Sequence, residues 1–134
     1  MNNISMIDYS WYQTLIQPPF QPPSWLFTPM WIFLYILIAI SLVFYIKAKT
    51  FESKTRGYVL FIIQLLLNFS WSPIFFGMKN ISLALIIILF LDFFVLLNIM
   101  EFKKISSKSS ILLIPYFLWI LFASYLNLGY FILN

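Results

Sequence analysis

Amide and aromatic side chains recur at helical spacing in two apolar stretches of the sequence. In the first stretch they are Gln64, Asn68, Trp71 and Phe75. In the second stretch the residues on one helical face are Pro115, Trp119, Ala123, Asn127 and Tyr130. Residues three or four apart share one side of a helix, so each stretch carries a polar and aromatic stripe. A cavity walled by such stripes suits a flat, largely apolar ligand that a few amides orient.

Buried amides are costly in a lipid bilayer unless a hydrogen-bond partner lies within reach. Gln64, Asn68 and Asn127 are therefore expected to face neighbouring helices or a cavity. For each amide alone, a hydrogen bond between helices is a sufficient explanation. The tryptophans beside them, together with a third aromatic stripe that contains Trp31 and Tyr35, favour a pocket instead.

The sequence lacks the side chains on which most catalytic and metal sites depend. It contains no His and no Cys. This composition excludes disulfides, thiolate nucleophiles, Cys/His metal clusters and an imidazole that acts as general base or axial haem ligand. We therefore expect no metal site, no required cofactor and no conventional catalytic set.

The composition is that of a protein embedded in a lipid bilayer. Of the 134 residues, 63% are hydrophobic and only 9% are charged, and the mean hydropathy is +0.95. A soluble domain of this size needs a far more polar surface. The basic residues behind the net charge of +4 fall mostly in two short loops, so they indicate membrane anchoring and not nucleic-acid binding.

Four apolar stretches are long enough to form membrane-spanning helices. They lie at about residues 29–47, 57–77, 81–100 and 111–133. Basic residues cluster after the first stretch and after the third, whereas the turn between the second and third carries Lys79 alone. The positive-inside rule places both basic loops in the cytoplasm and both termini outside the cell membrane. The abundance of Ile, Lys, Asn and Phe indicates an AT-rich bacterial genome.

The first 28 residues form a segment that is rich in proline and aromatic residues. Four of the six residues 18–23 are proline. Such a stretch cannot form a helix interior, because each proline lacks an N–H group and fixes φ. Trp11, Tyr12 and Trp25 flank it. We expect this segment to be a semi-rigid lid at the membrane surface, directly before the first spanning helix.

Asp92 is the single acidic residue within the third predicted helix. An ionisable residue inside the membrane is by default a functional hypothesis, here for a proton or cation pathway. The sequence does not identify its partner. A small four-helix multidrug exporter would carry a glutamate in its first span, and residues 29–47 contain none, so that kind of transporter is disfavoured.

Several short motifs occur in order along the chain, with helical spacing between them. They are Trp11-Tyr12, Pro22-Pro23-Ser24-Trp25, Pro29-Met30-Trp31, Tyr35, Gln64, Leu67-Asn68, Trp71-Ser72-Pro73, Phe75-Phe76, Pro115-Tyr116, Trp119, Phe122-Ala123 and Leu126-Asn127. From Tyr9 to the C-terminus this series resembles the TspO/MBR family, the tryptophan-rich sensory proteins that include the translocator protein or peripheral benzodiazepine receptor. The resemblance implies one transmembrane domain over residues 1–134, with residues 1–28 as the lid segment.

The resemblance also implies where a ligand binds. Family members bind porphyrins and other tetrapyrroles in an aromatic pocket between helices, which a loop caps. By position, Tyr12 and Pro22 belong to the capping loop. The residues that match the pocket wall are Trp31, Asn68, Trp119 and Ala123, and helical phase adds Gln64, Trp71 and Phe75. The expected ligand is protoporphyrin IX, a haem-like porphyrin or another flat apolar small molecule.

Three functions are consistent with this resemblance. The first is a membrane receptor or regulator that binds tetrapyrroles. The second is light-dependent porphyrin degradation, as in some bacterial relatives, with the indoles of Trp31 and Trp119 donating electrons to the photoexcited porphyrin. The third is a carrier for porphyrins or other amphipathic molecules. For Trp119, bulky packing with a paired N–H is an equally good explanation.

The sequence departs from the family pattern at two places. Family members have five transmembrane helices, and the first precedes the Trp-Tyr motif, but residues 1–10 are too short to cross a bilayer. The expected fold is an all-α, TspO-like transmembrane helix bundle in which four spans are visible and the family's first helix is missing. Either translation starts further upstream than this sequence records, or the chain is a truncated variant whose pocket has an open side. No basic residue follows Tyr130, so the cholesterol pattern of animal relatives is incomplete and sterol binding is not predicted.

The oligomeric state follows from the resemblance alone. Family members often pair as homodimers, so a homodimer is the expectation. The chain contains no GxxxG motif, which is the common sequence signature of closely packed membrane helices. The sequence itself therefore indicates no dimer interface.

Overall fold

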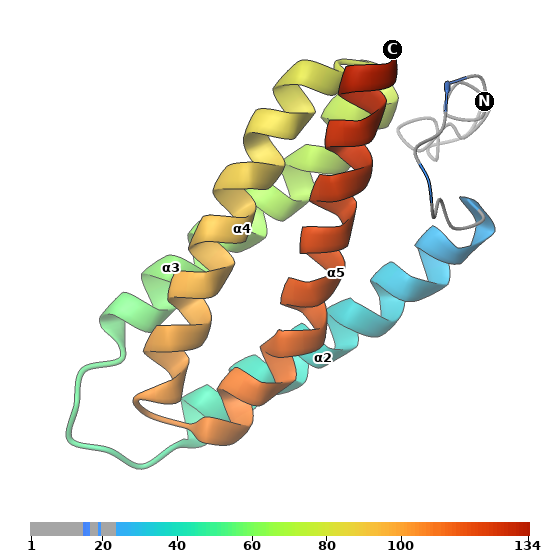
Figure 1. Ribbon diagram of the computed structural model, residues 1–134. Helices are drawn as coiled ribbons and strands as arrows, with labels where there is room; N and C mark the ends of the chain where they lie inside the picture. The colour runs from blue at the N-terminus through green and yellow to red at the C-terminus, as the bar shows by residue number, and fades with distance from the viewer. Residues whose placement is uncertain (1–14, 17–18, 20–23) are drawn as a thin grey trace.

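The computed structural model describes residues 15, 16, 19 and 24–134 (Figure 1). Its elements in chain order are η2 (Ser24–Leu26), α2 (Phe27–Lys47), α3 (Thr55–Ser72), η3 (Pro73–Gly77), α4 (Ile81–Lys103) and α5 (Ser107–Leu133). With η3 counted as the continuation of α3, four helices are long and apolar enough to cross a membrane. The predicted all-α bundle with four membrane-spanning helices is confirmed.

Three of the helices begin earlier than the sequence predicts, and one of them is α3, which begins at Thr55. α2 begins at Phe27, directly after η2, so Pro29 lies in its first turn. A missing N–H costs nothing there, because the first four N–H groups of a helix have no partner within it. α5 begins at Ser107, because the Ser106 side-chain oxygen accepts a hydrogen bond from the Ser109 N–H at 3.2 Å and caps the helix.

The helices pack in the spatial order α2, α5, α4 and α3, so that α5 lies between α2 and α4. Consecutive helices therefore pack side by side except for α2 and α3, which lie at opposite ends of this order. From the loop that joins them, α2 leans away from α3 toward the opposite end of the bundle (Figure 1). At that end the backbones of α2, α3 and α5 do not pack closely, and side chains border the space between them.

Two serines join α2 to α5 near the end from which α2 leans away. Ser41 Oγ donates to the Ser109 carbonyl oxygen at 2.6 Å, and Ser109 Oγ donates to the Ser41 carbonyl oxygen at 2.5 Å. Both residues are fully buried. Small polar side chains let two membrane helices approach closely and pair their hydroxyl groups without water. These reciprocal hydrogen bonds fix one end of α2 against α5.

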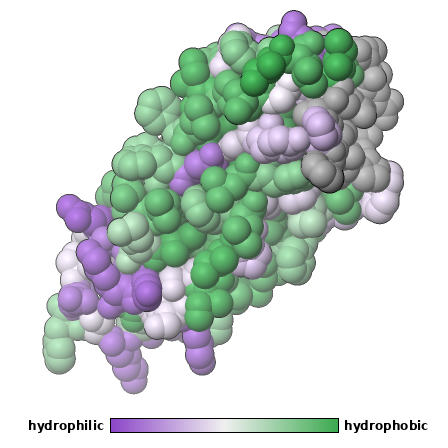
Figure 2. Space-filling view, viewed as in Figure 1, coloured by the Kyte–Doolittle hydropathy of each residue, from purple (hydrophilic) through white to green (hydrophobic). Residues whose placement is uncertain are grey.

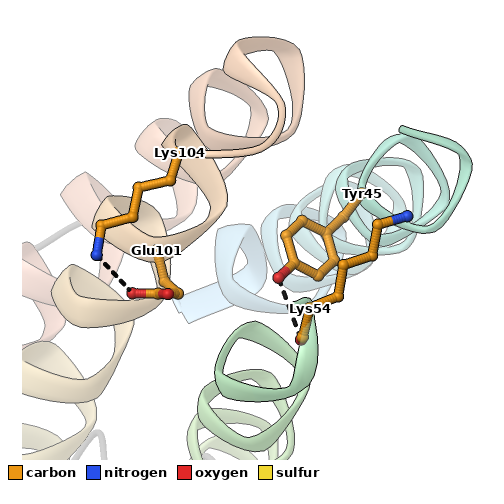
Figure 3. Close-up of polar contacts among 4 residues, drawn as sticks. All are labelled: Tyr45, Lys54, Glu101 and Lys104. Atoms are coloured by element: carbon orange, nitrogen blue, oxygen red, sulfur yellow. Dashed lines mark hydrogen bonds and ion pairs between the residues drawn. The ribbon is translucent and has the colours of Figure 1, made fainter. Parts of the chain in front are cut away.

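Charged residues gather at this same end, as the purple surface in Figure 2 shows. It holds the α2–α3 loop and the α4–α5 loop. Lys104 forms an ion pair with Glu101 at 3.2 Å, and the Tyr45 hydroxyl donates to the Lys54 carbonyl oxygen at 3.2 Å (Figure 3). Lys54 Nζ also donates to two carbonyl groups at the end of α2, at 2.8 and 2.7 Å. The two basic loops therefore share one end of the bundle.

Tyr45 closes the hydrophobic core at the charged end. Its ring stacks on Phe102, with ring centroids 4.0 Å apart, and meets Tyr58 edge-on at 5.3 Å. Gly57 lies directly against this ring, because a Cβ atom added at Gly57 would lie 2.1 Å from the Tyr45 hydroxyl oxygen. Only glycine permits this approach of α3 to α2.

We predict that Gly57→Ala destabilises the bundle by about 1–3 kcal/mol, the usual cost of overpacking a core. The expected result is a lower thermal unfolding midpoint in detergent or lipid. In a Tyr45→Ala background the same substitution should cost much less, because the clashing ring is gone. An equal cost in both backgrounds would contradict the proposed clash.

Candidate functional site

A cavity of about 260 Å³ lies between α2, α3 with η3, and α5, at the end of the bundle opposite the charged loops. Its lining is mostly aromatic and aliphatic, with a few hydroxyl and amide groups. The lining residues are Phe27, Thr28, Trp31, Ile32, Tyr35, Asn68, Trp71, Ser72, Phe75, Phe76, Trp119, Ala123, Leu126, Asn127 and Tyr130. Among the described residues, no charged side chain lines it.

Three tryptophans from three different helices form the aromatic wall of the cavity. The rings of Trp31 and Trp119 meet edge to face, with centroids 6.5 Å apart and an angle of 85° between their planes. Phe27 packs against Trp119 at 6.1 Å, and Trp71 lies 5.2 Å from Phe75. Large rings in these arrangements cannot fill the space completely, and their faces line what remains.

The π-helical turn η3 shapes the α3 side of the cavity. Its backbone pattern is set by a hydrogen bond of 2.9 Å from the Met78 N–H to the Pro73 carbonyl oxygen, five residues earlier. The wider turn accompanies a lining that includes two consecutive residues, Phe75 and Phe76. Consecutive residues also line the cavity from the regular helices, as Phe27 with Thr28 and Leu126 with Asn127 do, so such a pair does not require a π-helical turn.

A chain of hydrogen bonds forms the floor of the cavity and joins α2, α3 and α5. The Tyr35 hydroxyl donates to Asn68 Oδ1. Asn68 Nδ2 donates to the Tyr116 hydroxyl oxygen at 2.9 Å, and the Tyr116 hydroxyl donates to Gln64 Oε1 at 2.8 Å. Tyr35 and Asn68 face the cavity, whereas Tyr116 and Gln64 are fully buried beneath it. The floor is therefore held by a chain of three hydrogen bonds, whereas Gln64 Nε2 at its end is buried without a partner among the described residues.

A second amide ties the walls of the cavity together near the α3–α4 turn. Asn127 Oδ1 accepts a hydrogen bond from Trp71 Nε1 at 2.9 Å. Asn127 Nδ2 donates to the Ile81 carbonyl oxygen in the first turn of α4 at 3.1 Å. One side chain of α5 thus orients the indole of α3 and anchors the beginning of α4.

Trp119 differs from Trp71 in its polar group. Its Nε1 atom is shielded from solvent and has no hydrogen-bond partner within the part of the chain that the structure describes. An unpaired buried N–H is unfavourable and is satisfied when an acceptor approaches it. The expectation that Trp119 is packing with a paired N–H is therefore not met among the described residues.

The sequence profile of the TspO/MBR family matches residues 2–133. The chain belongs to the TspO/MBR family. It is 42% identical over 120 residues to the tryptophan-rich protein TspO of Chlorobaculum tepidum, covering 88% of this chain and 76% of that protein. To the protein of the same name from Archaeoglobus fulgidus it is 45% identical over 126 residues, covering 93% and 80%. The translocator protein of Ovis aries is 32% identical over 123 residues, covering 89% and 72%.

Membership in the TspO/MBR family, together with four apolar helices, makes this chain a multi-pass membrane protein. It also supports a role as a membrane receptor or sensor. The family assignment made from the motifs in the sequence is confirmed. Family membership does not by itself give the ligand or the roles of individual residues.

Most of the predicted ligand-binding residues lie together in the structure. Six of them line the cavity: Trp31, Asn68, Trp71, Phe75, Trp119 and Ala123. Gln64 is not among the lining residues, because it lies one turn before Asn68 and is bonded to Tyr116 inside the bundle. Tyr12 and Pro22 lie outside the described residues.

Several lining residues were not among the predicted site residues. Phe27 and Leu126 are ordinary apolar residues by type, but Phe27 lies four residues before Trp31, and helical spacing could have found it. Phe76 lies in the π-helical turn η3. A proline at the end of a helix signals an irregular backbone but not which residues it redirects.

Three described positions of the segment before α2 lie against the end of α5. The Ile16 N–H donates to Asn134 Oδ1 at 3.0 Å, and Asn134 Nδ2 donates to the Ile16 carbonyl oxygen at 3.1 Å. The Tyr125 hydroxyl donates to the Pro19 carbonyl oxygen at 2.7 Å. Leu15 packs on the apolar cluster that includes Phe27, Phe75 and Leu126. These positions are therefore held at the cavity end of the bundle.

We predict that Tyr116→Phe destabilises the protein by about 1–2 kcal/mol, since two interhelical hydrogen bonds are lost and their partners stay buried. Unfolding monitored by circular dichroism in detergent measures this loss of stability. Tyr125→Phe is the matched control on the same helix, because within the described part of the chain its exposed hydroxyl bonds to the Pro19 carbonyl oxygen alone. The control should change stability less. Equal effects of the two substitutions would show that the buried network contributes little.

Proposed function

We propose that this protein is a membrane receptor that binds a porphyrin or a related tetrapyrrole in the cavity between α2, α3 and α5. The observation that carries the proposal is the cavity wall. Trp31, Trp71 and Trp119 present indole rings to one space, and Asn68 adds an amide. Flat aromatic ligands bind by stacking on such rings, and polar groups at the wall fix their orientation.

The size of the cavity defines how a tetrapyrrole would fit. Small-molecule pockets are usually about 300–1,000 Å³, and a cavity of about 260 Å³ lies just below that range. One edge of a macrocycle would enter between the tryptophans, and the rest would extend toward the mouth.

The segment before α2 is proposed as the lid over this mouth. Support comes from the contacts of Ile16 with Asn134 and of Pro19 with Tyr125, which hold parts of the segment at the cavity end. Tyr12 and Pro22 are proposed as the lid residues that reach the ligand. With the basic loops in the cytoplasm, the lid and the cavity face the outside of the cell.

The test of binding is a titration with protoporphyrin IX in the dark, followed by tryptophan fluorescence. Three of the five tryptophans line the cavity, so bound porphyrin should quench most of the emission. Ala123→Phe fills the cavity from α5 and should weaken binding at least about tenfold, or about 1.4 kcal/mol. Ala39→Phe, on the exposed face of α2, is the matched control and should bind like the unmodified protein.

Two results would contradict the proposal. The first is an absence of quenching at micromolar porphyrin, which would remove tetrapyrroles as ligands. The second is equal weakening by Ala123→Phe and Ala39→Phe, which would place the porphyrin on the lipid-facing surface rather than in the cavity.

The contact between Trp31 and Trp119 favours a second function, which is light-dependent degradation of the porphyrin. An indole can give one electron to a photoexcited porphyrin, leaving an indole radical cation and a porphyrin radical anion. Dioxygen would then add to the porphyrin radical anion, and return of one electron from this adduct to the indole radical cation would leave an oxygenated macrocycle that can open and an intact tryptophan. Adjacent rings at 6.5 Å would share the oxidising equivalent between two residues. No acid–base group is needed for this step, in keeping with a chain that lacks His and Cys.

We predict that illumination bleaches the absorption of bound porphyrin if this second function operates, and that Trp119→Phe slows the bleaching about tenfold. Trp25→Phe is the control, because Trp25 is 70% exposed and does not line the cavity. Stable absorption under light, with quenching still present in the dark, would leave the receptor function and exclude the enzyme.

A further inference from the structure

The contact between α4 and α5 contains an acidic residue whose hydrogen bonds cannot be completed in its ionised form. Asp92 Oδ2 lies 2.5 Å from Ser124 Oγ. The same Ser124 Oγ lies 2.8 Å from the Ile120 carbonyl oxygen, one turn earlier in α5. Both distances are those of hydrogen bonds.

A serine hydroxyl has one hydrogen and can donate only one of these two bonds. The Ile120 carbonyl oxygen can only accept, so Ser124 must supply the hydrogen of that bond. The hydrogen between Asp92 and Ser124 must then come from Asp92. If Asp92 were ionised, one pair of oxygen atoms would stay in contact without a hydrogen between them, in a medium where such repulsion is weakly screened.

The other carboxyl oxygen leads to the same conclusion. Asp92 Oδ1 is shielded from solvent and has no hydrogen-bond partner among the residues that the structure describes. An unpaired carbonyl oxygen of a neutral acid is tolerated far better than an unpaired carboxylate oxygen at membrane depth.

No basic side chain lies near Asp92 on the described helices that pack around it. The neighbouring α3 and η3 carry no acidic or basic residue between Arg56 and Lys79, and α5 carries none after Lys108. On α4 itself the next charged residue is Glu101, at the charged end. The phenol of Tyr116 on α5 is hydrogen-bonded to Asn68 and Gln64 and supplies no positive charge.

We propose that Asp92 and Ser124 form a proton-binding site between α4 and α5, and that the proton keeps the wall of the cavity in its present packing. Asp92 donates to Ser124, and Ser124 donates to Ile120. Trp119 and Ala123, the residues that directly precede Ile120 and Ser124, line the cavity. Loss of the proton removes one bond and leaves a carboxylate that needs water, so the α4–α5 contact must loosen beside Trp119.

The site is tested by infrared spectroscopy of the full chain in lipid, from mildly acidic to alkaline pH. A protonated carboxylic acid gives a carbonyl stretching band that a carboxylate lacks. We expect this band at mildly acidic pH and its loss in Asp92→Asn. Glu101→Gln is the control and should leave the band unchanged, because Glu101 lies at the charged end, where it forms an ion pair with Lys104 outside the Asp92–Ser124 contact.

Ser124→Ala provides a second variant that keeps the acid. It should shift the band to higher frequency, because the acid loses its hydrogen-bond acceptor. Absence of the band at mildly acidic pH, or its persistence in Asp92→Asn, would overturn the proton site.

The link to the cavity is measured without any ligand. At alkaline pH, loss of the band should coincide with a shift in the tryptophan emission of the unmodified protein, and Asp92→Asn should show no such shift. Loss of the band with unchanged emission would overturn the link. Because no porphyrin is used, failure of this experiment is distinguishable from failure of the proposed binding function.

Discussion

Tyr116 supplies one hydroxyl group on which the packing around the cavity depends. It accepts a hydrogen bond from Asn68 and donates one to Gln64, and Asn68 in turn accepts from Tyr35. In a bilayer no water is available to replace any of these partners. The chain of hydrogen bonds therefore connects α2 to α3 through side chains, although their backbones do not pack closely. This is why the two helices can stay apart and still be held in one arrangement.

The cavity follows from a difference in side-chain size between the two ends of the bundle. At the charged end, Ser41 meets Ser109 and Gly57 meets Tyr45, and these small residues let the helices approach. At the other end the contact between α2 and α5 is made by Trp31 and Trp119. Helices that are close at one end and separated by indoles at the other must diverge, and the space between them is lined by the rings that separate them.

Much of this arrangement could be predicted from the sequence, because a membrane-spanning helix keeps one residue period over its whole length. The spacing of Asn68, Trp71 and Phe75 placed them on one face, and they do line one cavity. Helical phase does not specify depth, however. Gln64 shares the same face but lies one turn farther from the cavity, where its side-chain oxygen accepts a hydrogen bond from the Tyr116 hydroxyl.

Other features depend on contacts between residues far apart in the chain. The partner of Asp92 is Ser124, the one serine of α5 that lies beyond its first turn, but this position alone does not show that the two side chains face each other. Phe75 and Phe76 lie in a π-helical turn, which interrupts the regular residue period of the α-helix. A periodic pattern predicts which residues turn inward, but the identity of the partner and the local change of period are set by the packed bundle.

The neutral polar groups at the cavity and the carboxyl group of Asp92 lie on different sides of α5. Toward the cavity this helix presents Trp119, Ala123 and Asn127, which are neutral, and toward α4 it presents Ser124 to the carboxyl group of Asp92. A ligand that enters the cavity meets no counter-ion there among the described residues, so its charged groups must stay at the mouth, where water reaches them. The apolar body of the ligand is thus selected by the cavity, and its orientation follows from where its charges can remain hydrated.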